Sequence, residues 1–463
     1  MRSFINTLAW AILLVSAASA QDSANIWIDP NGGNCTRSAS PVAFSSVAAC
    51  GTVAAAWNAA QGGDTIIAKG GTYSSGFSAS GAKSSVVTIK AASGENPWFA
   101  GDGSLSGVSN MAVTDDRPIT DFAKLAGRGS GLTVGELSVG GGSSNVTFTN
   151  IDAYCQNQSP WHMVNGQSGS SCDTSVVISD VNGFTWTGGS IGPIAACSTS
   201  PCSGGDNTNK ITACSSNAAC TNITFRGVVF HDVLAFDSND HQEAFKIDQG
   251  SNILFQNNIF LRCKNCNSAT VFFGQSGSKD TADNVTFIGN IIGPAEGGGA
   301  GLNYAYNAPS GRATHLTFRY NSVDGTLNFS GPYTTGTLPG TNITLEGNTA
   351  WKQSYQGCIS GATYTKNTWY ASGGTAPAQC GTDNGPQSTS SGFWVSPGSP
   401  NYDYHLATKS PLIGTGGTGC SNLTDIYGDA RPAGAVCDVG ADESGSGPTV
   451  ALAPPTNLTV SVH

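Results

Sequence analysis

The chain has 463 residues, of which 61 are glycine and only 11% are charged. Its 20 Lys and Arg against 30 Asp and Glu give a formal net charge of -10. An acidic chain without a stripe of basic residues is a poor candidate for binding nucleic acid, because such a site needs clustered positive charge.

Residues 1–20 have the pattern of a secretory signal peptide. They contain Arg2, an apolar run from Leu8 to Val15 and the small residues Ala18-Ser-Ala20, which predict cleavage before Gln21. No other stretch reaches the roughly 18 apolar residues that a membrane span needs. We therefore expect an exported protein, extracellular or periplasmic, with no membrane span.

Residues 46–100 predict one helix followed by strands. Ser46 to Ala60 is rich in alanine and contains Trp57, which favours a short helix. Gly63 to Tyr73 then reads as a strand and a turn, and Ser85 to Ala91 reads as the next strand.

A short strand motif then repeats along the chain. Its copies begin with Asn145-Val-Thr-Phe, Gly183-Phe-Thr-Trp, Asn222-Ile-Thr-Phe, Asn252-Ile-Leu-Phe, Asn284-Val-Thr-Phe, His315-Leu-Thr-Phe and Asn342-Ile-Thr-Leu, at steps of 27 to 39 residues. A period near 30 residues marks a solenoid. The units lack the apolar spacing of helical repeats, so the motif predicts an all-β fold, a parallel β-helix.

The repeat alignment makes two structural predictions. The leading Asn should occupy a corner, since Asn tolerates the left-handed backbone conformation. The residue after it should point inward and stack coil on coil, giving one ladder of Val146, Ile223, Ile253, Val285, Leu316 and Ile343.

All 14 cysteines follow the predicted cleavage site. An even number in an exported chain indicates disulfides, and in a solenoid sequential pairing is the simplest arrangement, although the sequence does not fix the connectivity. Cys263 and Cys266 form a single CxxC with no second CxxC and no suitably spaced His. We therefore favour a structural disulfide there over a zinc or redox site.

The clearest family resemblance lies near the C-terminus. Asn401-Tyr-Asp-Tyr-His-Leu, Asp425-Ile-Tyr-Gly-Asp-Ala-Arg-Pro and Cys437-Asp-Val-Gly-Ala-Asp-Glu443 are similar to the closing segment of many secreted bacterial right-handed β-helix proteins. The chain thus resembles the pectate-lyase-like superfamily of polysaccharide-active proteins. This resemblance implies a right-handed coil, a helical cap on the first coil, and a last coil closed by Asp425 to Glu443.

The domain organisation follows from these segments. We expect a signal peptide at 1–20, a β-helix domain at 21–443, and at 444–463 a linker with the truncated start of a fibronectin-III-like module. We expect the protein to be a monomer.

Ionisable residues gather around the strand Glu243-Ala-Phe-Lys-Ile-Asp248 in a chain that has few charges. Phe245 and Ile247 should point inward, which places Lys246 and Asp248 on the outer face, where stacked strands form a groove suited to an extended polymer. Asp237, Asp240 and His241 lie just upstream. The alternative is a solvated turn with incidental charges.

Three functions are compatible with this cluster. The first is metal-assisted β-elimination on an acidic polysaccharide, with Asp237, Asp240 and Asp248 as calcium ligands and with Lys246, His241 and Glu243 as catalytic residues. For this function we expect substrate contacts from Arg262, Lys264, Phe272 and Asn303. The second is glycoside hydrolysis by paired carboxylates. The third is a non-catalytic glycan-binding or adhesion solenoid that uses aromatic side chains.

Overall fold

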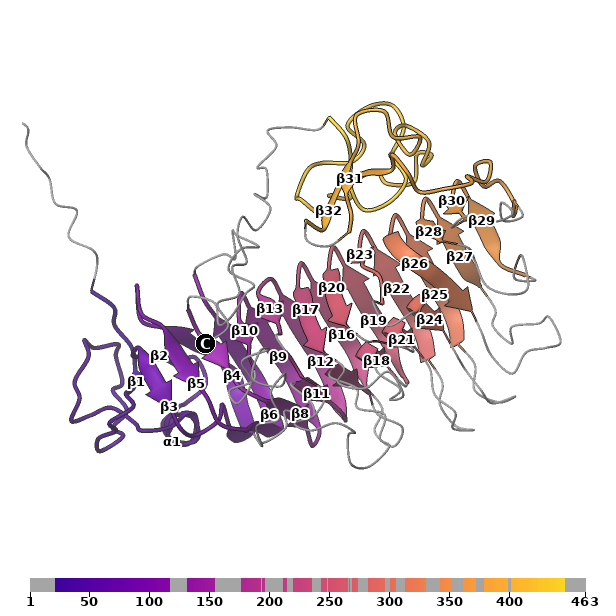
Figure 1. The fold of residues 1–463 in the computed structure, drawn as a ribbon. Helices are drawn as coiled ribbons and strands as arrows, with labels where there is room; N and C mark the ends of the chain where they lie inside the picture. The colour runs from indigo at the N-terminus through magenta and orange to yellow at the C-terminus, as the bar shows by residue number, and fades with distance from the viewer. Residues whose placement is uncertain are drawn as a thin grey trace, which may run out of the picture.

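The computed structural model describes residues 21–116, 131–154, 176–192, 194–195, 211–214, 220–234, 243–247, 249–264, 266, 269–273, 282–295, 300–304, 313–329, 342–351, 358, 361–371, 379–398 and 401–445. Within them the chain winds into a parallel β-helix, as the sequence predicts (Figure 1). No helix in these ranges is long and apolar enough to cross a membrane.

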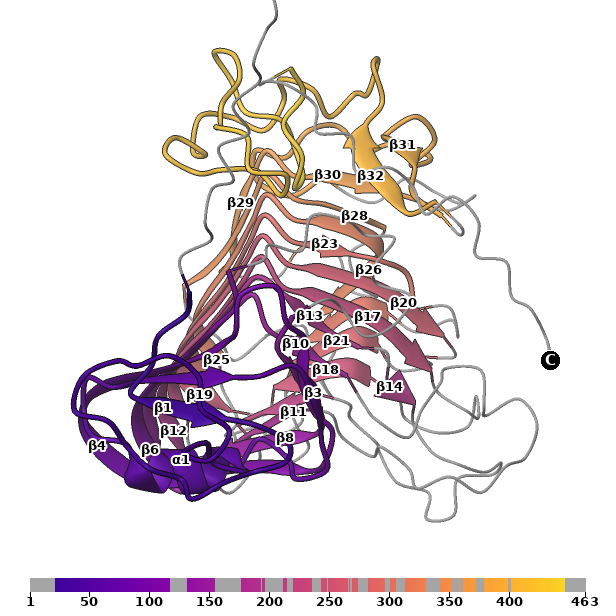
Figure 2. The ribbon, with the colours of Figure 1, turned by 90° about the vertical axis from the view of Figure 1, so that its left-hand side faces the viewer.

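The strands form three faces around one interior (Figure 2). The first face contains β1 (Ile26–Ile28), β2 (Thr65–Ala68), β4 (Ala79–Ala91), β6 (Gly103–Thr114), β9 (Ser143–Thr149), β12 (Val181–Thr187), β16 (Thr221–Arg226), β19 (Gly250–Gln256), β22 (Ala282–Ile288), β25 (Ala313–Arg319), β27 (Ile343–Glu346) and β29 (Thr363–Thr365). The second face contains β3 (Gly71–Tyr73), β5 (Pro97–Phe99), β7 (Thr133–Val134), β10 (Asp152–Ala153), β13 (Ser190–Ile191), β14 (Ile194–Ala195), β17 (Val229–Leu234), β20 (Ile259–Lys264), β23 (Ile291–Ile292), β26 (Ser322–Phe329), β28 (Thr349–Trp351) and β30 (Thr368–Tyr370). The third face begins with the first parts of β4 and β6, continues through β8 (Leu137–Gly140), β11 (Val176–Ile178), β15 (Ile211–Ala213), β18 (Glu243–Ile247), β21 (Ala269–Phe273) and β24 (Ala300–Tyr304), and ends on the second half of β26.

The first face confirms the predicted inward ladder. The parallel register aligns Val146, Phe184, Ile223, Ile253, Val285, Leu316 and Ile343 in one row. None of these side chains is more than 3% exposed. Two residues further along, Phe225, Phe255, Phe287 and Phe318 stack with ring centroids 4.6–5.4 Å apart. This burial of one apolar row per coil is the main stabilising contribution to the fold.

The predicted corner is also confirmed. The leading residues of the motif have left-handed backbone angles, with φ between 51° and 62° for Asn145, Asn222, Asn252, Asn284, His315 and Asn342. Their side chains are exposed, and the Asn252 amide donates to Asn222 at 3.0 Å while that of Asn284 donates to Asn252 at 2.9 Å. The row is therefore architectural.

A second asparagine ladder lies inside the solenoid, and our sequence analysis does not predict it. Each Nδ2 donates to the Oδ1 of the next member at 2.7–3.0 Å and to a backbone carbonyl of the first face. The ladder consists of Asn258, Asn290, Asn321, Asn348 and Asn367, and it ends on the carboxylate of Asp383. Because these amides are buried, their mutual bonds remove the cost of unsatisfied polar groups.

The first coil is covered by α1 (Val53–Ala59), which is shorter than the predicted helix of Ser46 to Ala60. Thr52 caps it, since its hydroxyl accepts the Ala55 N–H at 3.1 Å, so the helix starts only there. The side chain of Trp57, a residue of this helix, is fully buried and closes the core at this end.

The C-terminal segment, residues 393–398 and 401–445, corrects one expectation. It contains the antiparallel pair β31 (Trp394–Ser396) and β32 (Asp403–Leu406), and it lies along the outside of the second face, above β23, β28 and β30 in Figure 1. Its apolar residues Tyr404, Leu412 and Val439 pack in one cluster with the outward residues of the second face, which are Val229, Ile259, Leu261 and Ile291. The segment therefore covers the side of the solenoid rather than its far end, because apolar outward positions of the second face need cover.

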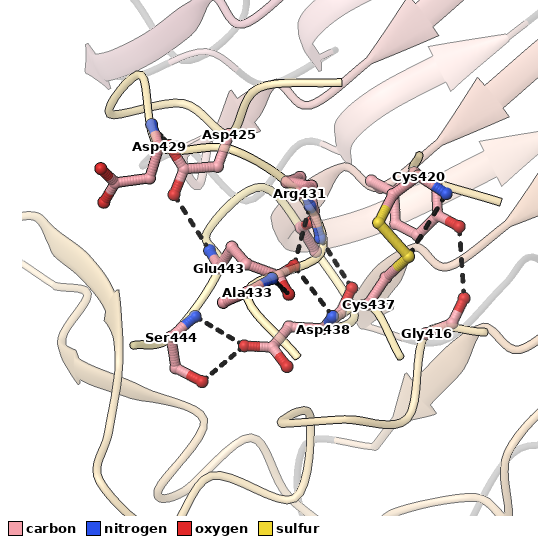
Figure 3. A network of polar contacts seen from close by, with 12 residues as sticks. Gly416, Cys420, Asp425, Asp429, Arg431, Ala433, Cys437, Asp438, Glu443 and Ser444 are labelled. Carbon is pink, nitrogen blue, oxygen red and sulfur yellow. Dashed lines mark hydrogen bonds and ion pairs between the residues drawn. A yellow bond between two sulfur atoms is a disulfide. The ribbon is translucent and has the colours of Figure 1, made fainter. Parts of the chain in front are cut away.

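The family-like motif of this segment forms its own polar network (Figure 3). The buried Arg431 and Glu443 form an ion pair at 2.9 Å, and Arg431 also donates to the carbonyls of Asp438 and Gly440. The guanidinium lies 4.6 Å from the ring centroid of Tyr320, which anchors the network on the solenoid.

The disulfides follow the sequential pattern. Within the described residues the pairs are Cys35–Cys50, Cys214–Cys220, Cys263–Cys266, Cys358–Cys380 and Cys420–Cys437. The CxxC is thus a disulfide, as predicted. The remaining cysteines, Cys155, Cys172, Cys197 and Cys202, lie outside the described residues.

Candidate functional site

The third face carries the predicted site on β18. Phe245 and Ile247 are fully buried, whereas Lys246 between them is half-buried and points outward, as the alternation predicts. The parallel register continues this position from coil to coil as a single row of Ser138, Val177, Thr212, Lys246, Phe272, Asn303 and Asn328.

Lys246 and Phe272 are neighbours in this row. The ammonium nitrogen of Lys246 lies 6.0 Å from the centroid of the Phe272 ring, within the range of a cation–π contact. An amine and an aromatic ring on consecutive coils offer a polar group and a stacking surface side by side. This arrangement suits a sugar ring.

Glu243 is placed differently from its predicted partner Lys246. It is the first residue of β18 and is only 3% exposed. The alternation puts Glu243 on the same side of the strand as Phe245, so the carboxylate and the Lys246 amine point to opposite sides.

The other predicted site residues are described in part or not at all. Asp237, Asp240, His241 and Asp248 lie outside the described residues, and for Lys264 and Asn303 the structure describes only the strand backbone. The part of the chain that is described contains no group of three or more His, Cys, Asp or Glu side chains able to hold a metal ion. The calcium site therefore stays a prediction.

Arg262, a predicted substrate contact, lies at the corner that leads from the second face to the third. Its Nη2 donates to the Asp232 carboxylate at 2.5 Å, and the same Asp232 oxygen lies 2.7 Å from Nδ1 of His231. We did not predict His231 as a site residue. The available signal was an adjacent His-Asp pair inside the apolar strand Val229–Leu234.

A second carboxylate, that of Asp152, is buried on the outer side of the second face, the side to which His231 also points. Asp152 accepts hydrogen bonds from the backbone N–H and the hydroxyl of Ser190 at 3.0 and 2.8 Å. Burial raises the pKa of Asp152, although the Ser190 hydrogen bonds and the nearby His231 act in the opposite direction.

Comparison with known proteins adds a fold-level likeness. No family model matches the chain, and no curated protein sequence matches it. The solved structures that it resembles include pectate lyase Pel9A (TM-score 0.39, 13% identity, 90% of this chain and 96% of that chain) and an alginate lyase from Paenibacillus sp. str. FPU-7 (TM-score 0.33, 13% identity, 73% and 96%). A third is the tailspike protein gp49 of the Acinetobacter baumannii bacteriophage Fri1, a capsular polysaccharide depolymerase (TM-score 0.35, 12% identity, 66% and 57%). At such identities and TM-scores these structures assign no activity to this chain.

Proposed function

We propose that this protein is a secreted enzyme that cleaves an extended acidic polysaccharide by β-elimination. The observation that carries the proposal is the outward pair of Lys246 and Phe272 on consecutive coils of the third face. Coils stack at about 4.8 Å, so the row through this pair is a straight track along which a linear polymer can lie.

Lys246 is the proposed base. In β-elimination the base removes the proton at C5 of a uronic acid, and the C–H electron pair forms the C4–C5 double bond. The C4–O4 bond then breaks, and the leaving oxygen takes a proton from water. Phe272 supports the proposal by offering an apolar surface that can hold the sugar ring beside the amine. His241 remains the alternative base.

The carboxylate of the sugar needs a positive partner, because the C5 proton becomes acidic only when that charge is offset. Arg262 and Lys264, on the neighbouring strand β20, are the proposed contacts. A calcium ion held by Asp237, Asp240 and Asp248 remains part of the proposal as an additional partner, and no step above depends on it.

Hydrolysis stays the alternative, but its two carboxylates would have to come from outside the row. Hydrolysis requires two carboxylates that flank the glycosidic bond. The row through Lys246, from Ser138 to Asn328, contains no Asp or Glu.

The test is a screen of purified protein against polygalacturonate, alginate, glycosaminoglycans and neutral glycans, with calcium and with a chelator. We expect new ultraviolet absorbance from unsaturated chain ends on at least one acidic polymer. New reducing ends without that absorbance would identify a hydrolase, and binding without cleavage would identify an adhesion module. Activity that survives chelation would contradict the calcium site but not β-elimination.

A further inference from the structure

The corner that holds Arg262 has the same left-handed backbone as the corners of the first face. Asp232 and Arg262 stand on consecutive coils and both have left-handed angles, with φ of 53° and 58°. This conformation is uncommon for a residue other than glycine, and its cost is tolerated where the surroundings require it. Unlike the asparagine corners of the first face, these two residues are oppositely charged and form an ion pair.

His231 stands beside this corner in a position where an apolar residue fits. The register aligns it with Leu261 on the next coil, and its side chain is fully buried. Its Nδ1 bonds to Asp232, whereas its Nε2 has no hydrogen-bond partner within the described part of the chain. A buried nitrogen without a partner lowers stability, so packing does not explain the choice of histidine.

Asp232 is the shared acceptor of the group. One of its oxygens receives both the Arg262 guanidinium and the His231 imidazole, at 2.5 and 2.7 Å. Two bonds to one oxygen fix the carboxylate in a single orientation, and the carboxylate in turn fixes the guanidinium. Asp152, another charged group near His231, is held by Ser190, and among the described residues Asp232 is the carboxylate that bonds to Arg262.

We propose that Asp232 and His231 are positioning residues that hold Arg262 as the contact for the carboxylate of a uronic acid sugar. This inference rests on the proposed function, since it names the part of that substrate which Arg262 recognises. The guanidinium has five N–H donors in a rigid fork, so a bond to Asp232 is compatible with a second contact to a ligand carboxylate. The side chain of Arg262 is 19% exposed, which gives such a ligand access.

The first test uses His231→Leu, which copies Leu261 of the next coil. We expect its free energy of unfolding to equal or exceed that of the wild type, because an unsatisfied buried nitrogen is removed. We expect KM on the acidic polymer that the wild type cleaves to rise about tenfold, as for the loss of a hydrogen bond to a charged group, with kcat nearly unchanged. His231→Asn keeps an N–H near the position of Nδ1 and should restore part of the KM. A merely structural histidine would lower stability on substitution by Leu and leave KM unchanged, which would overturn the inference.

The second test asks whether the corner reads the carboxylate itself. Circular dichroism first confirms that Asp232→Asn and Arg262→Lys are folded. These variants and the wild type are then compared on the acidic polymer that the wild type cleaves and on the methyl ester of that polymer. We expect both variants to lose about tenfold or more in affinity for the acid and little for the ester. If both variants keep the wild-type preference for the acid, the positioning role is wrong while the proposed function stands. If the wild type neither binds nor cleaves any polyuronate, both fail.

Discussion

At the scale of single residues, Lys246 is the sharpest test of the proposed chemistry. Lys246→Ala should lower turnover by about 100-fold or more, because a positioned base is lost. The fold should persist, since this side chain is only half-buried and the core residues beside it are unchanged. Arg226→Ala, an exposed change on the first face, is the matched control and should leave the rate as it is. Full activity of Lys246→Ala on a polymer that the parent cleaves would place the chemistry on another face.

Asp442 gives a pH prediction. Burial raises its pKa to about 6, with the backbone bond from Leu406 and the nearby His405 opposing the rise. The folded state therefore binds more protons than the unfolded state between about pH 4 and 6. The contribution of protonated Asp442 to the stability of the fold is complete below the pKa of Asp442 in the unfolded chain, and it is lost as the pH rises through about 6. A pKa shift of this size corresponds to about 3 kcal/mol in the free energy of unfolding.

Asp442→Asn should therefore flatten this part of the pH dependence. Denaturant unfolding at pH 4, 5, 6 and 7 measures it, and the difference between wild type and variant should grow towards pH 7 in favour of the variant. Asp180→Asn, an exposed corner substitution, serves as the control. A pH-independent difference would mean that Asp442 does not titrate in this range.

At the scale of elements, the two asparagine ladders should differ in strength. Asn321→Ala removes a buried amide whose oxygen accepts two bonds from Asn290 and whose nitrogen donates to Asn348, so we expect a loss of about 2–5 kcal/mol in the free energy of unfolding. Asn284→Gly keeps the left-handed corner and removes only an exposed amide, and should cost less than about 1 kcal/mol. Equal losses in denaturant unfolding would contradict this distinction.

The sequence predicted the first face well and the rest of the solenoid less completely. Val146, Ile223 and their equivalents follow a corner residue at regular steps, so period and alternation suffice to align them. The buried ladder from Asn258 to Asn367 was missed although an asparagine recurs five residues after Ile253, Val285, Leu316 and Ile343. The spacing alone does not show that these asparagines are buried, since burial depends on the neighbouring coil. The contact of His231 with Arg262 was missed for the same reason, because it joins two coils.

At the scale of the whole molecule, the C-terminal segment should behave as part of the hydrophobic core. Leu412 is fully buried in the cluster that it forms with the second face, and Leu412→Ala should cost about 2–5 kcal/mol. Val395 on the hairpin is 58% exposed, and Val395→Ala should change stability by less than about 0.5 kcal/mol.

Hydrogen exchange locates this effect. In Leu412→Ala, protection should fall in residues 401–445 and in β17, β20 and β23, while the strands of the first face keep theirs. A uniform loss of protection would mean that the segment and the solenoid unfold as one unit. The family resemblance led us to expect this segment at the far end of the solenoid. The sequence could not correct that expectation, because no local pattern tells which surface a distant segment will cover.

The buried ladder also bears on how such a molecule changes its length. Each asparagine from Asn290 to Asn367 receives a pair of N–H bonds from the preceding coil and passes the same pair on, so a duplicated coil that brings its own asparagine joins the column without altering its neighbours. Asp383 ends this possibility, because its two carboxylate oxygens accept from Asn367 and from the indole N–H of Trp369 and pass no amide bond to a further coil. Duplication of a coil is therefore possible in the middle of the solenoid and not at its end, and each added coil lengthens the solenoid by about 4.8 Å.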